Sequence, residues 1–342
     1  MNRRNFFALG AAFAGRPASA AATPPLVRAK ALRPGDTVGL ITPATFVSDP
    51  DRLALAERTL RHFGLRMKLG RHVRQRSGYL GGSARQRLED FHAMFRDPEV
   101  AGVFCIRGGF GSAHLLEAID YGLLRSHPKV FLGFSDITAL HLAIHRRTGL
   151  VTFHGPVVVS RFSDYTQRHF RQALFDNKPL GKLTNPPDSD PLRPAHTLRT
   201  VVPGTARGRL VGGNLSLIAS LMGTPYEIDT EGAILFLEDV GEEPYRIDGM
   251  LTQLRLAGKL AAAAGVIWGE CASCRPRTFD PSFDSTFSVG EVVDEILGKL
   301  KVPVLAGLTI GHTDDQLTLP LGVAAVLDAT AGTLTVEEAA TV

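Results

Sequence analysis

Short apolar segments alternate with helical patterns through the first half of the chain, and this alternation restricts the fold more than any other feature. Residues 37–42, 100–106 and 130–132 form runs with few polar side chains. Such runs are typical of strands that are buried on both faces of a sheet. Helical periodicity between them, as over residues 50–63, is typical of right-handed βαβ units. The sequence therefore predicts a parallel sheet with helices packed against it.

The second half of the chain has a different pattern, with short strands separated by glycines. Residues 181–205 contain five prolines and little periodicity, and we interpret them as a linker. We predict an α/β fold in two domains, an N-terminal flavodoxin-like parallel-sheet domain at 27–180 and a C-terminal, β-rich α/β domain at 206–340. Strands of the second domain are predicted at 206–211, 233–237, 263–268, 304–308, 316–319, 324–327 and 333–336. Helices are predicted at 83–95, 136–147, 215–222, 244–257 and 289–300.

The first residues of the chain contain the three regions of a secretory signal in order. A charged start with Arg3-Arg4 precedes an apolar stretch, and Ala18-Ser19-Ala20 is a cleavage site of the A-x-A type. The arginine pair followed by Asn5-Phe6-Phe7 is typical of a twin-arginine signal. We therefore expect residues 1–22 to direct the folded protein to the periplasm.

Removal of this signal changes the charge of the chain. The segment holds three arginines and no acidic residue, so 38 basic residues become 35, against 34 acidic ones. A net charge near zero gives no electrostatic footprint for a nucleic acid. The remaining chain has no apolar run of the roughly 20 residues that a membrane-spanning helix needs. We expect neither a nucleic acid nor a membrane as a partner after signal cleavage.

The three cysteines give no clear metal site. Cys105 lies in an apolar run and is expected in the core. Cys271 and Cys274 have the spacing of a metal or redox pair, but no second pair exists to complete a tetrahedral zinc site. An oxidising compartment could join them in a disulfide. We interpret them as packed free thiols near a strand end.

A glycine-framed turn, Gly133-Phe134-Ser135-Asp136, connects a predicted strand to a predicted helix. Such a turn lifts a serine hydroxyl above the sheet edge and directs helix N–H groups at a developing oxyanion. Residue 137 is isoleucine, whereas the nucleophile elbow of α/β-hydrolases has glycine there. The turn alone leaves two interpretations open, a nucleophile or an ordinary helix N-cap.

A nucleophilic serine needs a base, and the second half of the chain offers a base and a carboxylate to orient it. Glu238 directly follows the predicted strand 233–237. His312 lies in a glycine-flanked loop between two predicted strands. We interpret His154 as a structural residue and as the one rival base.

His141 and His145 are one helical turn apart, which is a zinc-like spacing. No glutamate follows His141, however, and we do not interpret the pair as a metal site.

Four segments, in order along the chain, resemble the LD-carboxypeptidases, the serine peptidase family that includes muramoyl-tetrapeptide carboxypeptidase and the microcin C self-immunity hydrolases. They are "IRGGFGSAHLL", "KVFLGFSDITALHLAIHRRTGLVTFHGP", "LVGGNLSLIASLMGTPYEIDTEGAILFLEDVGEEPYRIDGMLTQLRLAGKL" and "GLTIGHTDDQLTLPLG". This resemblance implies that Ser135 is the nucleophile, Glu238 the carboxylate and His312 the base, in a cleft between the two domains. No metal or organic cofactor is implied.

The resemblance also implies an oxyanion hole of backbone N–H groups, here those of Asp136 and of a glycine in Gly108-Gly109, with Gly109 as our choice. The implied substrate is a murein tetrapeptide or peptidoglycan stem peptide, from which the terminal D-alanine is released. A carboxypeptidase must bind a free carboxylate, and Arg107 is the candidate from its position at a strand end. Backbone N–H groups near Gly108, or the side chain of Asn214, are the alternatives.

Two other functions are weighed against this one. The immunity-type relatives cleave aminoacyl or peptidyl nucleotides and need an aromatic platform for the base. The only tryptophan, Trp268, is predicted in a buried strand, which favours the murein peptide. The non-enzymatic alternative is a periplasmic peptide-binding protein. Relatives are often dimers, so a homodimer is a further expectation.

Overall fold

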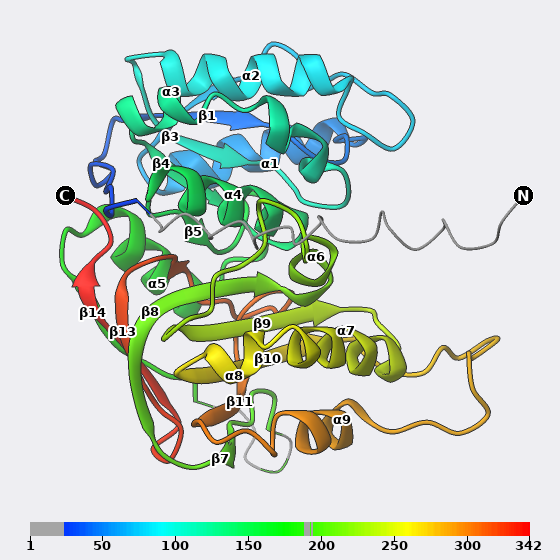
Figure 1. The fold of residues 1–342 in the computed structure, drawn as a ribbon. Helices are drawn as coiled ribbons and strands as arrows, with labels where there is room; N and C mark the ends of the chain where they lie inside the picture. Colours follow the sequence, from blue (N-terminus) through cyan, green and yellow to red (C-terminus); the bar gives the residue numbers. More distant parts are fainter. Residues whose placement is uncertain (1–23, 188–191, 193) are drawn as a thin grey trace, which may run out of the picture.

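The computed structural model describes residues 24–187, 192 and 194–342, and the predicted signal at 1–22 lies outside the described residues. Two β-sheets, each covered by helices, make up the two halves of the molecule (Figure 1). None of the described helices combines the length and the apolar character needed to cross a bilayer.

The first sheet has the strand order β12-β5-β4-β3-β1-β2. Its five N-terminal strands pair in parallel in the flavodoxin-like order 2-1-3-4-5, as the sequence predicts. β12 pairs antiparallel to β5. The strands are β1 (Thr37–Ile41), β2 (Arg66–Leu69), β3 (Val100–Cys105), β4 (Val130–Gly133), β5 (Phe153–His154) and β12 (Leu319–Pro320).

Helices cover both faces of the first sheet. One hydrophobic cluster joins β1 to α1 and α5, and another joins the opposite face to α2, α3 and α4. The helix predicted at 83–95 is present as α2, and it begins with a capping box in which Ser83 and Gln86 are bonded reciprocally. The helices are α1 (Pro50–His62), α2 (Ala84–Arg96), α3 (Tyr121–Ser126), α4 (Thr138–Thr148) and α5 (Asp164–Phe175), with two short 3₁₀ turns, η1 (Ser112–Ala118) and η2 (Ser135–Ile137).

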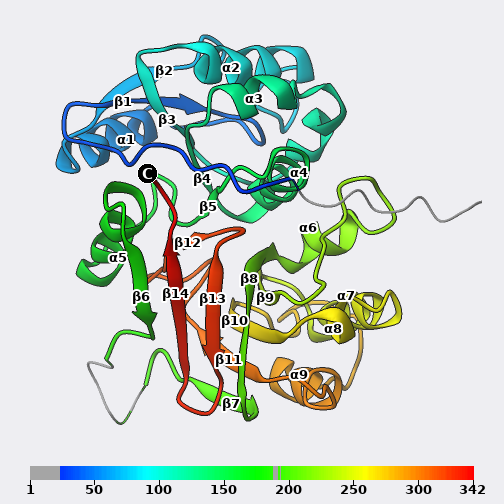
Figure 2. The same cartoon turned by 60° about the vertical axis from the view of Figure 1, so that its left-hand side comes forward.

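The second sheet has eight strands in the order β6-β14-β13-β8-β9-β10-β11-β7. Its centre, β8 to β11, is parallel, and antiparallel strands lie on both sides. Figure 2 shows β13 and β14 beside β8. The strands are β6 (Pro179–Leu183), β7 (Arg199–Val202), β8 (Thr205–Asn214), β9 (Ile234–Val240), β10 (Gly265–Ala272), β11 (Val304–Leu308), β13 (Ala324–Asp328) and β14 (Thr333–Ala339).

Four helices pack on the second sheet, and they share a hydrophobic cluster with the helices of the first. The cluster contains Leu140 of α4 and Ile218 of α6, so the hydrophobic interior continues from one half to the other. The helices are α6 (Leu215–Ser220), α7 (Pro244–Leu256), α8 (Lys259–Ala262) and α9 (Val289–Ile296).

Two strands cross the expected domain limits. β6 includes residue 180, where the first domain is predicted to end, and it belongs to the second sheet. The strand predicted at 316–319 in the second domain is shorter and pairs with β5 of the first sheet. The chain therefore returns to the first sheet directly after the loop that carries His312.

Candidate active site

Ser135 occupies a sharp turn between β4 and α4. Its φ is 64°, in the left-handed region that non-glycine residues seldom adopt. It is the first residue of η2, and the N-cap of α4 is Ile137, which makes no side-chain cap hydrogen bond. Ser135 is therefore not the N-cap of α4. A strained serine between a buried strand and a helix has the geometry of a nucleophile elbow.

The glycine-rich segment after β3 lies against this turn. A Cβ atom added to Gly108 would lie 2.9 Å from the Cβ of Ser135 and 3.2 Å from the backbone nitrogen of Asp136. The buried carboxylate of Asp136 accepts hydrogen bonds from the N–H groups of Gly111, at 3.2 Å, and Ser112, at 2.8 Å. These bonds fix the glycine segment to the serine turn, so a side chain at Gly108 could not be accommodated.

The backbone proposed for the oxyanion hole is in this contact region. Gly109 has a φ of 110°, and a Cβ there would lie 2.3 Å from the hydroxyl oxygen of Thr45. The same hydroxyl accepts a hydrogen bond from the N–H of Phe110 at 3.0 Å. Thr45 follows β1 and Gly109 follows β3, the two strands at which the order of the sheet reverses. Ligands of open α/β sheets bind outside the strand ends at such a point.

Glu238 and His312 form a hydrogen-bonded pair. Nδ1 of His312 is 2.8 Å from Oε2 of Glu238, whose side chain is 0% exposed. Gly311 has a φ of 85°, and a Cβ there would lie 2.0 Å from the same carboxylate oxygen. The imidazole ring packs 4.9 Å, centroid to centroid, from Phe134, the residue before Ser135. The structure therefore brings the predicted base and carboxylate together beside the serine turn.

The electrostatics of Glu238 combine two opposing effects. Burial raises the pKa of Glu238, and the hydrogen bond to His312 opposes that rise. Because Glu238 accepts the Nδ1 proton, Nε2 of His312 is the nitrogen that can accept a proton from another group. A buried carboxylate that fixes the tautomer and stabilises an imidazolium is the orienting member of a serine triad.

His141, His145 and His154 lie inside the protein. His154 is 0% exposed, packs against Phe236, and has a pKa far below its usual value because of burial. His141 bonds the carbonyl of Gly133 through Nε2 at 2.9 Å, and burial lowers its pKa to about 4. Among the residues that the structure describes, no group of three potential metal ligands is found. These surroundings favour structural roles for His154 and His141.

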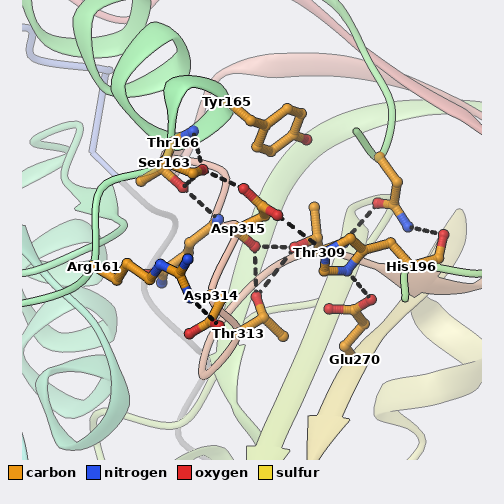
Figure 3. Close-up of polar contacts among 12 residues, drawn as sticks. Arg161, Ser163, Tyr165, Thr166, His196, Glu270, Thr309, Thr313, Asp314 and Asp315 are labelled. Carbon is orange, nitrogen blue, oxygen red and sulfur yellow. Dashed lines mark hydrogen bonds and ion pairs between the residues drawn. The ribbon is translucent and has the colours of Figure 1, made fainter. Parts of the chain in front are cut away.

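The loop that carries His312, residues 309–318 between β11 and β12, is anchored by its acidic residues (Figure 3). Asp315 accepts a hydrogen bond from Ser163, the N-cap of α5. Asp314 pairs with Arg161 at 2.8 Å. The N–H of residue 316 donates to the hydroxyl of Thr166 at 2.9 Å. The loop thereby connects the second sheet to the N-terminus of α5.

His196, from the expected linker, joins this anchor to β10. Its Nδ1 is 2.7 Å from Oε1 of Glu270, and its Nε2 is 3.1 Å from Oδ2 of Asp315 (Figure 3). Burial lowers the pKa of His196, but its hydrogen bonds to the two carboxylates outweigh that effect, so the pKa is raised. No motif in the sequence indicated this cluster, because its members come from three distant segments.

The two predicted substrate-binding side chains lie in different environments. Arg107 is half-buried, and its Nη1 donates to the carbonyl of Phe46 at 3.4 Å. Within the described ranges no carboxylate is at ion-pair distance from it. Asn214 is 3% exposed, caps α6 through its carbonyl oxygen, and donates one amide N–H to Asp239. The contacts of Asn214 favour a structural role over substrate binding.

An aromatic pair at the glycine segment was not predicted. Tyr79 and Phe110 are exposed, and their rings meet edge to face with centroids 5.5 Å apart. Exposed aromatic side chains beside a site are typical of ligand contacts. Phe110 is part of the Arg107–Gly111 motif, so its position in the sequence was a usable signal.

Both halves of the chain match domains of a known protein family. Residues 38–155 match the LD-carboxypeptidase N-terminal domain, and residues 207–327 match the LD-carboxypeptidase C-terminal domain. The matched residues include Ser135, Glu238 and His312.

Named relatives and solved structures agree with this match. The chain is 43% identical over 308 residues to a probable murein peptide carboxypeptidase of Bacillus subtilis, covering 90% of this chain and 93% of that protein. It is 34% identical to a murein tetrapeptide carboxypeptidase of Pseudomonas aeruginosa, covering 85% and 92%. The structure is similar to that of the microcin C7 self-immunity protein MccF, with a TM-score of 0.82, 25% identity and coverage of 92% and 100%.

Proposed function

The chain belongs to the LD-carboxypeptidase family and is a serine carboxypeptidase, and we propose that Ser135, His312 and Glu238 are its catalytic triad. We propose further that the enzyme releases the terminal D-alanine from a murein tetrapeptide. The relative with 43% identity is named for a murein peptide, and the one with 34% identity for a murein tetrapeptide.

In the proposed reaction, the Ser135 hydroxyl attacks the carbonyl of the bond between an L-centred residue and D-alanine. Nε2 of His312 accepts the serine proton, while Glu238 holds the imidazole and stabilises its charge. The N–H groups of Asp136 and Gly109 bind the oxyanion. His312 then protonates the leaving amine, and water hydrolyses the acyl-enzyme.

One observation carries this proposal. Glu238 of the second sheet forms a 2.8 Å hydrogen bond with His312, and the His312 ring packs on Phe134, next to the strained Ser135. A buried carboxylate bonded to a partly exposed imidazole, near a strained serine, provides the three groups of a serine triad.

The test is incubation of the purified protein with a murein tetrapeptide, followed by mass spectrometry of released D-alanine. Wild-type protein is expected to release it, and Ser135→Ala is expected to lose at least 10³-fold in kcat, an order of magnitude taken from other serine triads. Ser126→Ala, at an exposed residue at the end of α3, is the matched control and should match wild type. Turnover by Ser135→Ala within tenfold of wild type would remove Ser135 from this role.

The nucleotide-type function has one supporting observation, the TM-score of 0.82 to MccF, against 0.75 to a muramoyltetrapeptide carboxypeptidase from Oxalobacter formigenes. Trp268, the only tryptophan, is 4% exposed and packs in the core, so it offers no platform for a base. Aspartyl sulfamoyl adenosine, which is bound to MccF in a solved complex, serves as the competing substrate. Faster cleavage of this compound than of the tetrapeptide would favour the second function.

A separate experiment tests the alternative that the protein binds a peptide without catalysing its cleavage. A serine-directed phosphonate should add covalently to Ser135 in wild-type protein. Labelling should be absent in Ser135→Ala and unchanged in Ser126→Ala. A folded wild-type protein that binds the tetrapeptide but takes up no phosphonate would indicate a binding protein.

We propose Arg107 as the residue that binds the terminal carboxylate of the substrate. It follows β3, precedes Gly108, and its described contacts leave the guanidinium without a carboxylate partner. Arg107→Ala should raise KM about tenfold or more for a peptide with a free terminus, but not for its amide, and Arg107→Lys should restore part of the loss. An equal rise in KM for both peptides would contradict this role.

The export signal at 1–22 is a proposal from the sequence alone. Cell fractionation of the full-length chain should find the processed protein in the periplasm. Full-length protein confined to the cytosol would overturn it.

A further inference from the structure

Two thiols that the proposed reaction does not use lie side by side at the end of β10. The Sγ atoms of Cys271 and Cys274 are 2.7 Å apart. The N–H of Cys274 donates to the carbonyl of Cys271 at 3.4 Å, and Ser273 has a φ of 58°, so the four residues form a tight turn. A disulfide bond is about 2.0 Å long, so the sulfur atoms need to approach by only about 0.7 Å.

Both cysteines of the turn are partly exposed. Each side chain is half-buried and packs against the hydrophobic core. Residues 275–288, which follow the turn, are exposed and contain no strand or helix before α9. Cys105 is different, because it is fully buried in β3 and burial raises its pKa well above the usual value. The chain therefore contains its own unreactive control thiol.

The two thiols of the turn have unequal surroundings. The hydrogen bond with Cys271, and further hydrogen bonds from the backbone of Glu242 and Gly241, lower the pKa of Cys274. The hydrogen bond with Cys274, burial and the nearby carboxylate of Asp239 raise the pKa of Cys271. Since the thiolate is the nucleophile in thiol–disulfide exchange, Cys274 is the better attacking group.

We propose that Cys271 and Cys274 form a redox-active pair that closes to an intramolecular disulfide by exchange with a small disulfide compound. The Cys274 thiolate attacks one sulfur of the small disulfide, which forms a mixed disulfide and releases one small thiolate. Cys271 then loses its proton, and its sulfur attacks Cys274 and displaces the second small thiolate. The two protein thiols are oxidised, and one small disulfide is reduced to two thiols.

The pair adjoins the segment that carries the proposed orienting carboxylate. Cys271 lies opposite Asp239 in the register of β9 and β10, and Asp239 follows Glu238. The N–H of Gly241 donates to the carbonyl of Ala272, within the cysteine turn, at 2.9 Å. The disulfide would thus join the two ends of the cysteine turn, which is hydrogen-bonded to the segment that carries Glu238. Formation of the disulfide does not depend on the proposed function.

The experiment measures the bond itself. The folded full-length protein is treated with glutathione disulfide, quenched with acid, alkylated with iodoacetamide after unfolding, and mapped by mass spectrometry. We expect the peptide spanning residues 271–274 to lose two hydrogens and take up no alkyl group, while Cys105 is alkylated. Full alkylation of Cys271 and Cys274 after treatment would overturn the proposal.

Single substitutions test the assigned order of attack. Cys271→Ser should accumulate a mixed disulfide with glutathione at Cys274, because the resolving thiol is absent. Cys274→Ser should form its mixed disulfide at Cys271 at least tenfold more slowly, and Cys105→Ser should behave as wild type. Equal rates for the first two variants would overturn the assignment, and the wild-type measurement stands even if a variant does not fold.

Discussion

Ser135 is held in a backbone conformation that costs about 1–2 kcal/mol for a residue with a side chain. Its φ of 64° is maintained by contacts on both sides, from Gly108 and from the hydrogen bonds that Asp136 accepts. Strain of this kind is kept where the surrounding structure fixes it, as at active sites. The glycine at residue 108 and the carboxylate at residue 136 therefore both stabilise the backbone conformation that positions the serine hydroxyl.

At the same scale, Glu238→Gln should lower the activity of the enzyme without lowering its stability. Folding raises the pKa of Glu238, so at pH values above its unfolded pKa the ionised group disfavours the folded state. The neutral variant is expected to be at least as stable as wild type at neutral pH, yet to lose about 10²- to 10⁴-fold in kcat. Thermal denaturation and D-alanine release measure the two effects, with exposed Glu117→Gln as control. A variant that keeps wild-type kcat would exclude Glu238 from the triad.

Gly311→Ala tests how closely the Glu238–His312 pair must fit, without replacing either of its side chains. The new Cβ would be 2.0 Å from Oε2 of Glu238, and the φ of 85° would add about 1–2 kcal/mol of strain. We expect kcat to fall by about 10²-fold or more while the protein still folds. Gly249→Ala, in α7 with nothing within 4 Å of the new atom, is the matched control. Unchanged kinetics in Gly311→Ala would mean that the pair does not need its observed spacing.

Among elements, the loop at residues 309–318 is held by several partners that are distant in sequence. It is held by α5 through Ser163 and Thr166, and by β10 through His196 and Glu270. Since His312 is part of this loop, its position is set by side chains that are far from it in sequence.

His196→Asn is expected to loosen this loop in a pH-dependent way. The pKa of His196 is raised in the folded protein, so its contribution to stability is present below the unfolded pKa of about 6.5 and is lost as the pH rises through the folded pKa. The loss of stability on substitution should therefore be larger at about pH 6 than at about pH 9. Denaturant unfolding at both pH values measures it, with the exposed His127→Asn as control. An equal loss at both values would exclude a charged His196.

Sequence patterns predicted the elements whose local signals are strong. The helix that begins after Ser83, the apolar runs of β1 and β3, and the helix after Pro244 are confirmed. α5 was missed, although Ser163 caps it. The pairing of β12 with β5 could not be predicted, because two residues carry no periodicity and their partner lies in the other half of the chain.

The candidate site was predictable only in part. The turn at Ser135 follows from local sequence, but the assignment of Glu238 and His312 came from resemblance to a family. The cluster of His196, Glu270 and Asp315 had no sequence signal, since each residue alone resembles a solvated surface group.

At the scale of the whole molecule, the two halves share one continuous interior. Leu140 of α4 and Ile218 of α6 belong to the same hydrophobic cluster, and β12 belongs to the first sheet although it follows β11 of the second. We therefore expect the described part of the chain to unfold as one cooperative unit.

Two natural probes report on the two halves. Trp268 in β10 gives fluorescence from the second sheet, and Cys105 in β3 becomes open to alkylation when the first sheet unfolds. In a variant with Cys271→Ser and Cys274→Ser, both signals should have the same denaturant midpoint. Two separate midpoints would show that the halves unfold independently.

The crossing of β12 also limits how this enzyme can be recombined. A chimera that joins the first half of this chain to the second half of a relative would receive a foreign strand at the edge of the first sheet. Leu319 pairs with His154, and Pro320 with Phe153, so both sides of that ladder must come from compatible parents. A crossover at the linker would therefore replace β12 of the first sheet together with the second sheet. To exchange substrate preference in this way, residues 153–154 would have to come from the same parent as the second half.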